Sequence, residues 1–196
     1  MSQLIFIIDP MCSWCWGFHP IIDKIRSVHS EHYTFDLVVG GLRTLGQMPW
    51  NDESKNYLKQ NWDAVQQSTG QNFHPRILNL SSFDYNTYPA CKAIVTVREL
   101  WGTDAAFTYL YDIQSAFYTQ GIDITSLEIL TSYIRQDKKT FLHFYQSDRA
   151  HILMQHDFSK ARSMGANAFP STVKIDEDGH MICLTGYRHL NEILTL

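Results

Sequence analysis

Two cysteines near the N-terminus have the spacing of a pair that can form an intramolecular disulfide and be reduced again. Cys12 and Cys15 follow an apolar run at residues 4–8, which predicts a buried strand, and precede residues 18–26, whose apolar spacing predicts an amphipathic helix. A cysteine at this junction lies near the free N–H groups and the positive dipole end of the helix, which favour the thiolate. Because the thiolate is the form that attacks disulfides, the pair predicts thiol–disulfide exchange.

We predict different roles for the two cysteines. Cys12, at the start of the helix, should be the more exposed sulfur and the nucleophile, with a lowered pKa. Cys15, about one turn later, would attack the mixed disulfide and release the reduced partner. Ser13 and Trp14 lie between them and would tune the reduction potential of the couple. Trp14 is either an apolar contact for a bound peptide or a partly exposed packing residue.

The other cysteines and the histidines do not complete a metal site. A tetrahedral zinc site needs four ligands, and one Cys-x-x-Cys supplies two. Cys91 and Cys183 stand alone, and the nine histidines show no ligand spacing. No metal ligand is therefore predicted. Cys183 is interpreted as a core residue of a strand. Cys91 is interpreted as core, with a transient disulfide bridge or a glutathione adduct as the alternative.

Composition limits the classes of function. The chain has 196 residues, 44% of them hydrophobic and 18% charged, which is typical of a globular protein. The net charge of −4, without a basic stripe, argues against a nucleic-acid partner. No run approaches the roughly 20 apolar residues of a membrane span. No signal-peptide pattern is present, so a full-length gene product of this sequence would be cytoplasmic.

Helix and strand signals divide the chain into three parts. The first, residues 1–48, and the third, residues 161–196, contain the predicted strands, whereas residues 49–160 read as helical. We expect strands at 3–8, 34–39, 171–175 and 180–184, and helices at about 16–29 and 188–194 around the helical block. The predicted fold class is therefore α/β, with the order βαβ, helical block, ββα.

This order resembles the thioredoxin fold, and the large all-helical insertion resembles the DsbA-like branch of that fold. Residues 9–18, which read Asp-Pro-Met-Cys-Ser-Trp-Cys-Trp-Gly-Phe, look like a cytosolic DsbA-family subgroup close to FrnE-type dithiol–disulfide isomerases. Other segments also look like parts of that subgroup, in the same order: residues 88–93, 116–118 with 121–124, and 165–172. The resemblance covers nearly the whole chain.

The resemblance implies further site residues. It implies that Pro170 follows a cis peptide bond facing the cysteines, and that the backbone of Phe169 contacts an extended substrate strand. One position departs from the thioredoxin pattern, because Phe6 stands where many relatives carry a buried carboxylate. Asp9 is the nearest acid. It either holds the turn beside Pro10 or assists proton transfer.

Three functions remain open at this point. The leading one is a thiol–disulfide oxidoreductase or isomerase acting on protein or peptide thiols and disulfides. It needs no cofactor beyond the Cys12–Cys15 disulfide, and glutathione is the candidate co-substrate. The second is a glutathione-dependent small-molecule enzyme of the 2-hydroxychromene-2-carboxylate isomerase or kappa glutathione transferase type, although those typically lack the full Cys-x-x-Cys. The third is a peptide-binding chaperone. The sequence assigns no oligomeric state.

Overall fold

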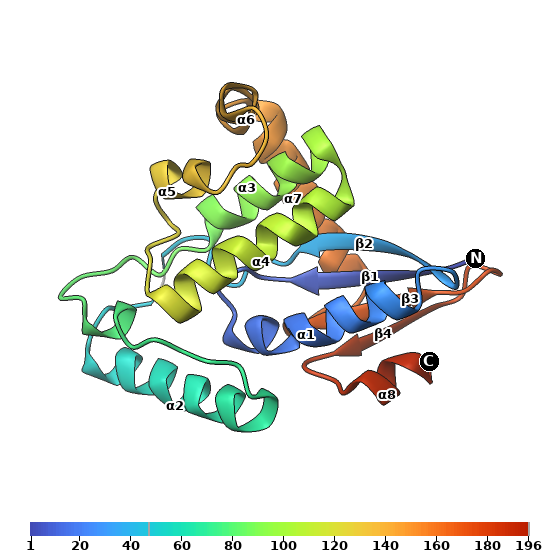
Figure 1. Ribbon diagram of the computed structural model, residues 1–196, viewed down its shortest axis with the longest axis horizontal. Coiled ribbons are helices and arrows are strands. Elements are labelled where there is room, and N and C mark those ends of the chain that lie inside the picture. The colour runs from blue at the N-terminus through green and yellow to red at the C-terminus, as the bar shows by residue number, and fades with distance from the viewer. Residues whose placement is uncertain (47, 196) are drawn as a thin grey trace.

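A four-stranded mixed sheet organises the described residues, which are 1–46 and 48–195 of the computed structural model (Figure 1). The strands are β1 (Ser2–Ile8), β2 (Tyr33–Val39), β3 (Ser171–Ile175) and β4 (Met181–Thr185). Their order is β2-β1-β3-β4. β1 is parallel to β2 and antiparallel to β3, and β3 is antiparallel to β4. The predicted βαβ and ββα halves are thus joined through the central pair of β1 and β3.

Helices connect and cover this sheet. Helix α1 (Ser13–Val28) links β1 to β2, and α8 (Leu190–Leu194) follows β4. The helical block between β2 and β3 consists of α2 (Asp52–Thr69), the short 3-10 helix η1 (Ile77–Asn79), α3 (Tyr88–Trp101), α4 (Thr103–Gln120), α5 (Leu127–Ser132), α6 (Lys138–Tyr145) and α7 (Asp148–Ser163). None of the described helices is both long and apolar enough to cross a membrane. The division at 48/49 and 160/161 stays a prediction.

The alternating side chains of β1 explain why the sheet is covered on both faces. Successive residues of a strand point to opposite faces. Leu4, Phe6 and Ile8 join the main apolar cluster, which includes residues of α1, α3 and α4. Ile5 and Ile7 join a second cluster with Ala161 of α7. Since every one of these strand residues is buried, β1 forms the centre of the core.

An ion pair between a partly buried arginine and a buried aspartate ties the helical block to the sheet. Arg98 of α3 donates two hydrogen bonds of 2.7 Å to the carboxylate of Asp157 on α7. The Asp157 carboxylate also accepts the backbone N–H of Val39 on β2 at 3.0 Å, and Arg98 donates to the Leu37 carbonyl. The charges of both side chains are therefore compensated where the block meets the edge of the sheet.

Helix α1 begins three residues earlier than the predicted start at residue 16. Cys12 has an extended backbone (φ −85°, ψ 119°) and is the N-cap. Its carbonyl accepts the N–H groups of Cys15 at 3.0 Å and Trp16 at 3.1 Å. The helix also continues through Pro20, which cannot bond the carbonyl of Trp16, and the side chain of Gln71 donates to that carbonyl at 3.2 Å.

The prediction that Cys183 is a core residue is wrong. Cys183 is only partly buried, and its neighbours on β4, Met181 and Ile182, are 46% and 49% exposed. The physical reason is the position of the strand. β4 is an edge strand, whereas α7 packs against β2 at the opposite edge of the sheet, so β4 lacks a full helical cover.

Candidate active site

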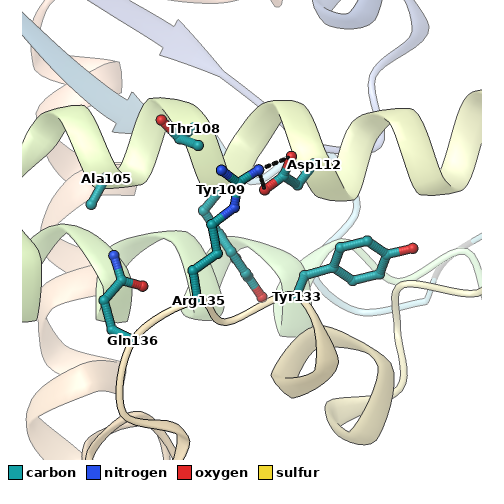
Figure 2. A pocket seen from close by; sticks show the side chains of 7 residues that line it. All are labelled: Ala105, Thr108, Tyr109, Asp112, Tyr133, Arg135 and Gln136. Atoms are coloured by element: carbon teal, nitrogen blue, oxygen red, sulfur yellow. Dashed lines mark hydrogen bonds and ion pairs between the residues drawn. The ribbon is translucent and has the colours of Figure 1, made fainter.

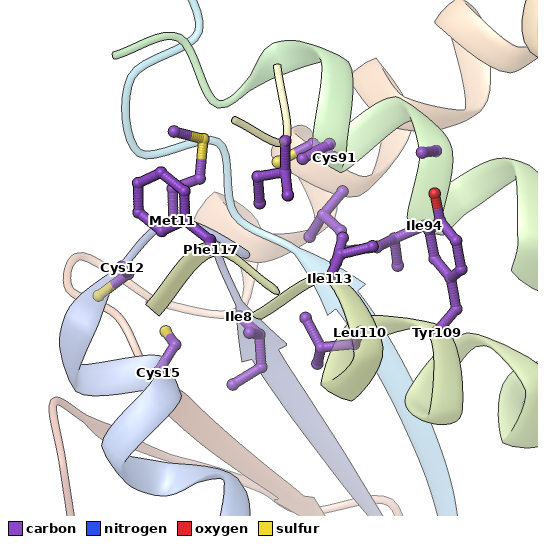
Figure 3. Packing of buried hydrophobic residues seen from close by; sticks show 14 of the residues in the cluster. Ile8, Met11, Cys12, Cys15, Cys91, Ile94, Tyr109, Leu110, Ile113 and Phe117 are labelled. Carbon is purple, nitrogen blue, oxygen red and sulfur yellow. The ribbon is translucent and has the colours of Figure 1, made fainter. Parts of the chain in front are cut away.

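The two cysteines of the motif lie at the start of α1, beside the end of β1 (Figure 3). Both thiols are free. Cys12 is 7% exposed and Cys15 is 1% exposed, so the expectation that Cys12 is the more accessible sulfur is confirmed. Cys12 occupies the N-cap position, where the free N–H groups of the helix gather, and Cys15 lies within the first turn behind it.

The loop before β3 lies next to Cys12. The Cys12 thiol donates to the backbone carbonyl of Phe169 at 3.4 Å. The peptide bond between Phe169 and Pro170 is cis, and Pro170 is buried. Strand register explains the approach, because Ser171 pairs with Ile7 near the end of β1. Antiparallel pairing of β1 with β3 therefore brings two distant segments of the chain to one site.

Phe169 packs its ring over Gly40. A Cβ atom at position 40 would lie 2.1 Å from a carbon of the Phe169 ring, which is closer than any real contact. Gly40 directly follows β2. The absence of a side chain at this position thus makes room for the ring, while the Phe169 carbonyl faces Cys12.

Cys15 is placed to stay protonated until it reacts. Burial is the main cause that raises the pKa of its thiol well above the usual value, and the contact with Cys12 and the charge of Asp9 raise it further. One group acts in the opposite direction, since the backbone N–H of Asp9 donates to Cys15 Sγ at 3.5 Å. This donor would stabilise a thiolate at Cys15 once it forms.

Asp9 is fully buried and organises the loop before Cys12. Its carboxylate accepts the backbone N–H of Met11 at 2.9 Å and of Leu42 at 2.6 Å. The first of these bonds confirms that Asp9 holds the turn. Burial raises the pKa of Asp9, and the two N–H donors oppose that effect. A role of Asp9 in proton transfer stays a prediction.

Cys91 is a buried residue of α3, as the core interpretation predicts. It has no exposed surface, and its thiol donates to the Asp9 carboxylate at 3.6 Å. Burial raises the pKa of the Cys91 thiol well above its ordinary value, and the negative charge of Asp9 adds to the effect. Figure 3 shows Cys91 apart from Cys12 and Cys15. A disulfide bridge or a glutathione adduct at Cys91 stays a prediction.

Sequence reasoning missed Tyr85. Its hydroxyl donates to the carbonyl of Met11 at 2.5 Å, and the side chain is only 1% exposed. It therefore fixes the residue immediately before Cys12. Burial raises the pKa of Tyr85, so the hydroxyl remains a donor at neutral pH. No local motif points to this contact, because the two residues are 74 positions apart in the chain.

An open groove of about 320 Å³ runs past the first cysteine. Four of the predicted site residues line it, namely Cys12, Ser13, Trp14 and Phe169, and residues that the sequence did not single out complete it: Met11, Leu42, Arg43, Tyr57, Leu58, Asn61, Tyr85, Asn167 and Ala168. Cys15 and Pro170 are buried beside it. Trp14 is half-buried, with its ring 5.5 Å from that of Tyr187, so it both packs and faces the groove.

Two other polar clusters lie away from the cysteines. A cavity of about 220 Å³ in the helical block is lined by Arg135 and Asp112, whose charges neutralise each other at 2.7 Å (Figure 2). The turn between β3 and β4 gathers Asp176, Asp178 and His180. There the Asp176 carboxylate accepts two backbone N–H groups, which hold the turn. Neither cluster includes a thiol.

The chain is similar to several known proteins in sequence and in fold. Residues 5–194 match the sequence profile of a thioredoxin family. A candidate protein disulfide isomerase from Nitrosomonas europaea is 30% identical with a TM-score of 0.88, covering 99% of this chain and 94% of that one. The cytosolic disulfide reductase DsbM from Pseudomonas aeruginosa is 22% identical with a TM-score of 0.77, covering 93% and 88%. The structure of DsbM with GSH is 21% identical with a TM-score of 0.75, covering 93% of this chain and 89% of that one.

Two other similar proteins are described in other terms. A 2-hydroxychromene-2-carboxylate isomerase is 15% identical with a TM-score of 0.66, covering 98% of this chain and 91% of that one. The ClpXP adapter protein SpxH from Halalkalibacterium halodurans is 23% identical, over 94% of this chain and 63% of the adapter. The chain thus spans less than two thirds of this curated relative. The profile match over nearly all of the sequence, together with the sheet order and the helical block, shows that this chain belongs to the thioredoxin family and has a DsbA-like oxidoreductase fold.

Proposed function

We propose that the protein is a dithiol–disulfide oxidoreductase in which Cys12 is the nucleophile and Cys15 the resolving thiol. The observation that carries this proposal is the arrangement of the two sulfurs. Cys12 caps α1 at the wall of an open groove, and Cys15 is buried one turn behind it. Helix N-caps favour a thiolate, and the accessible sulfur of a pair is the one that a disulfide can approach.

The reaction proceeds in two balanced exchanges. The Cys12 thiolate attacks one sulfur of a substrate disulfide, forms a mixed disulfide with it, and releases the other substrate sulfur as a thiolate. Cys15 then loses its proton and attacks Cys12 Sγ, which forms the Cys12–Cys15 disulfide and releases the second substrate thiolate. Two electrons pass from the protein dithiol to the substrate disulfide. The reverse sequence oxidises a substrate dithiol, and attack followed by return of the substrate thiol isomerises a disulfide without net transfer.

The groove supports a peptide or protein substrate. Leu42 and Tyr57 on its wall are 38% and 53% exposed, so they offer apolar surface for contact with a peptide. Glutathione is the proposed co-substrate, because the similar DsbM was solved with GSH. A cytoplasmic location is also part of the proposal and is compatible with the description of DsbM as cytosolic.

The first test is dithiothreitol-dependent reduction of insulin. We expect the wild-type protein to accelerate it and Cys12→Ser to abolish the effect, because the nucleophile is lost. Cys15→Ser should retain the first exchange but trap the substrate as a mixed disulfide on Cys12, which intact-protein mass spectrometry would detect. Cys183→Ser is the matched control, since this cysteine is partly exposed on β4 and does not line the groove. It should behave as wild type.

The outcomes separate the candidate functions. Wild-type protein that neither reduces insulin nor refolds scrambled ribonuclease would refute the oxidoreductase. Turnover of 2-hydroxychromene-2-carboxylate with glutathione, in the absence of insulin reduction, would favour the glutathione-dependent small-molecule enzyme. Unchanged peptide binding by a Cys12→Ser, Cys15→Ser double variant, again without turnover in the wild type, would favour a peptide-binding protein.

A second test follows from the buried state of Cys15. In the Cys183→Ser variant, which lacks the partly exposed thiol of β4, reaction with 5,5′-dithiobis(2-nitrobenzoate) should release two chromophores. Cys12 releases the first when it attacks the reagent, and Cys15 releases the second when it attacks the mixed disulfide on Cys12. Since burial raises the pKa of the Cys15 thiol, we expect the second phase to accelerate as pH rises above neutrality. When Cys15→Ser is added to this variant, the second phase should vanish while the first persists. A second phase that is independent of pH would contradict the role assigned to Cys15.

A further inference from the structure

The groove is lined by one cation, Arg43, for which the described residues supply no acidic partner. Arg43 follows β2 and lies on the groove wall together with Cys12. Its side chain is half-buried. In the described part of the chain, the ion pairs involve other cations, and Arg43 belongs to none of them. The guanidinium instead lies over the ring of Tyr85, 5.2 Å from the ring centroid.

The base of the Arg43 side chain is held firmly. The Arg43 backbone N–H donates to the hydroxyl of Thr87 at 3.2 Å, and its carbonyl accepts the Thr87 N–H at 2.8 Å. Thr87 is fully buried and is the N-cap of α3. Since the backbone is fixed on both sides and the guanidinium rests on an aromatic ring, little conformational entropy remains to be lost when an anion binds.

The same tyrosine connects Arg43 to the reacting sulfur. The Tyr85 ring faces the guanidinium, and the Tyr85 hydroxyl bonds the carbonyl of Met11, the residue before Cys12. The cation and the nucleophile are therefore positioned by a single buried side chain. A substrate whose sulfur reaches Cys12 would place its neighbouring groups within the same groove.

The chemistry of the remaining wall leaves the charge of Arg43 uncompensated. The lining residues include no aspartate or glutamate, although the protein as a whole has a net charge of −4. Asn61 and Asn167 add amide groups that can donate hydrogen bonds. A planar guanidinium pairs best with a carboxylate, which it can bind through two parallel hydrogen bonds.

We propose that Arg43 binds a carboxylate of the substrate, so that the groove selects small peptide disulfides that carry free carboxylates near the sulfur. This inference rests on the proposed function and specifies the substrate class of the same site. In the reaction, the reduced protein transfers two electrons to the substrate disulfide, forms the Cys12–Cys15 disulfide and releases two substrate thiols. Arg43 contributes binding and orientation and takes no part in the exchange of bonds.

The test compares two disulfides that differ in charge. The reduced protein is mixed with glutathione disulfide or with the neutral bis(2-hydroxyethyl) disulfide, and the two second-order rate constants are measured. For Arg43→Gln, the ratio of the glutathione rate to the neutral rate should fall about tenfold, as expected for the loss of a charge-assisted contact. Lys24→Gln is the matched control, because it removes one exposed positive charge on α1 outside the groove lining. Its ratio should be unchanged.

A second measurement uses the wild-type protein, so its result does not depend on whether Arg43→Gln folds. Glutathione disulfide esterified on its carboxylates should react with the wild type more slowly than the free acid does, by about the factor lost in Arg43→Gln. An unchanged ratio in Arg43→Gln, including equal slowing of both disulfides, would overturn the carboxylate site, and so would equal reactivity of the ester and the free acid. If the wild type reacts with neither disulfide but still reduces insulin, only the carboxylate site is overturned; if insulin is not reduced either, the proposed function fails as well.

Discussion

Asp9 and Asp157 are both buried carboxylates, but their surroundings differ. Asp157, 2% exposed, receives two hydrogen bonds from the guanidinium of Arg98 and joins α7 to the sheet. Asp9, with no exposed surface, pairs with no described cation and is surrounded by backbone N–H groups and the thiol of Cys91. Burial raises the pKa of Asp9. The charge at the block junction is compensated, whereas the charge beside the cysteines is not.

The difference separates two uses of a buried acid. A carboxylate paired with arginine holds two elements in register and has no reason to change protonation. A carboxylate held by neutral donors can respond to the ionisation of its neighbours, and here Asp9 lies beside the buried Cys15, whose pKa its charge raises. Three changes would break or sharpen this comparison.

The largest effect is expected from Arg98→Met. This variant leaves the buried carboxylate of Asp157 without its cation, and we expect it to lower the free energy of unfolding by about 3 kcal/mol. Urea unfolding monitored by circular dichroism measures the loss. The matched control is Arg149→Met, which removes a cation that is 66% exposed and paired with Glu99. It should change stability by less than about 1 kcal/mol. If the two variants were equally stable, Arg98 would contribute no more to stability than an exposed surface cation does.

The second change, Asp9→Asn, tests how the carboxyl group without a cation makes the unfolding free energy depend on pH. Because burial raises the pKa of Asp9, the folded protein keeps this proton where the unfolded chain, with a pKa of about 3.9, has released it. The stability from this group is therefore complete below that value and is lost as pH rises through the raised pKa. Relative to Asp9→Asn, the wild type should lose at most about 1.4 kcal/mol per pH unit across this window. Urea unfolding at a series of pH values measures this loss. If the unfolding free energies of the wild type and Asp9→Asn changed with pH in parallel, the raised pKa of Asp9 would be contradicted.

The smallest effect is expected from Cys91→Ala. The substitution removes a weak S–H donor to Asp9 and leaves a small void, so we expect a loss of about 1 kcal/mol in unfolding free energy. Insulin reduction should continue, because the buried thiol is not part of the exchange. A glutathione adduct on Cys91, detected by mass spectrometry of the native protein, would show that this cysteine is redox-active and would support the alternative left open by the sequence.

Local patterns predicted the parts of the fold and site that depend on neighbours in the chain. The strand, the Cys-x-x-Cys and the helix occupy consecutive residues, so their order and the greater exposure of Cys12 could be read directly. Asp9 was recognised as a turn residue for the same reason. The start of α1 was misplaced because the signal for it was the apolar spacing of later residues, whereas the cap is Cys12 itself.

Contacts between distant segments could not be predicted in this way. Tyr85 reaches the site through the chain path of the helical block and Arg43 through the segment after β2, and neither belongs to a motif that marks the site. The partial exposure of Cys183 depends on which strand lies at the edge of the sheet, which alternation within the strand does not reveal. In both cases the three-dimensional arrangement, and not the local pattern, decides the role of the residue.

The close approach of Gly40 and Phe169 has a consequence for the evolution of this site. Because the ring fills the space that a side chain at position 40 would need, the two positions cannot enlarge independently. A homologue with a larger residue at position 40 must carry a smaller one at position 169, turn the ring away from position 40, or move the loop away from Cys12. Across an alignment of many such proteins, side-chain size at these two positions should therefore be inversely correlated.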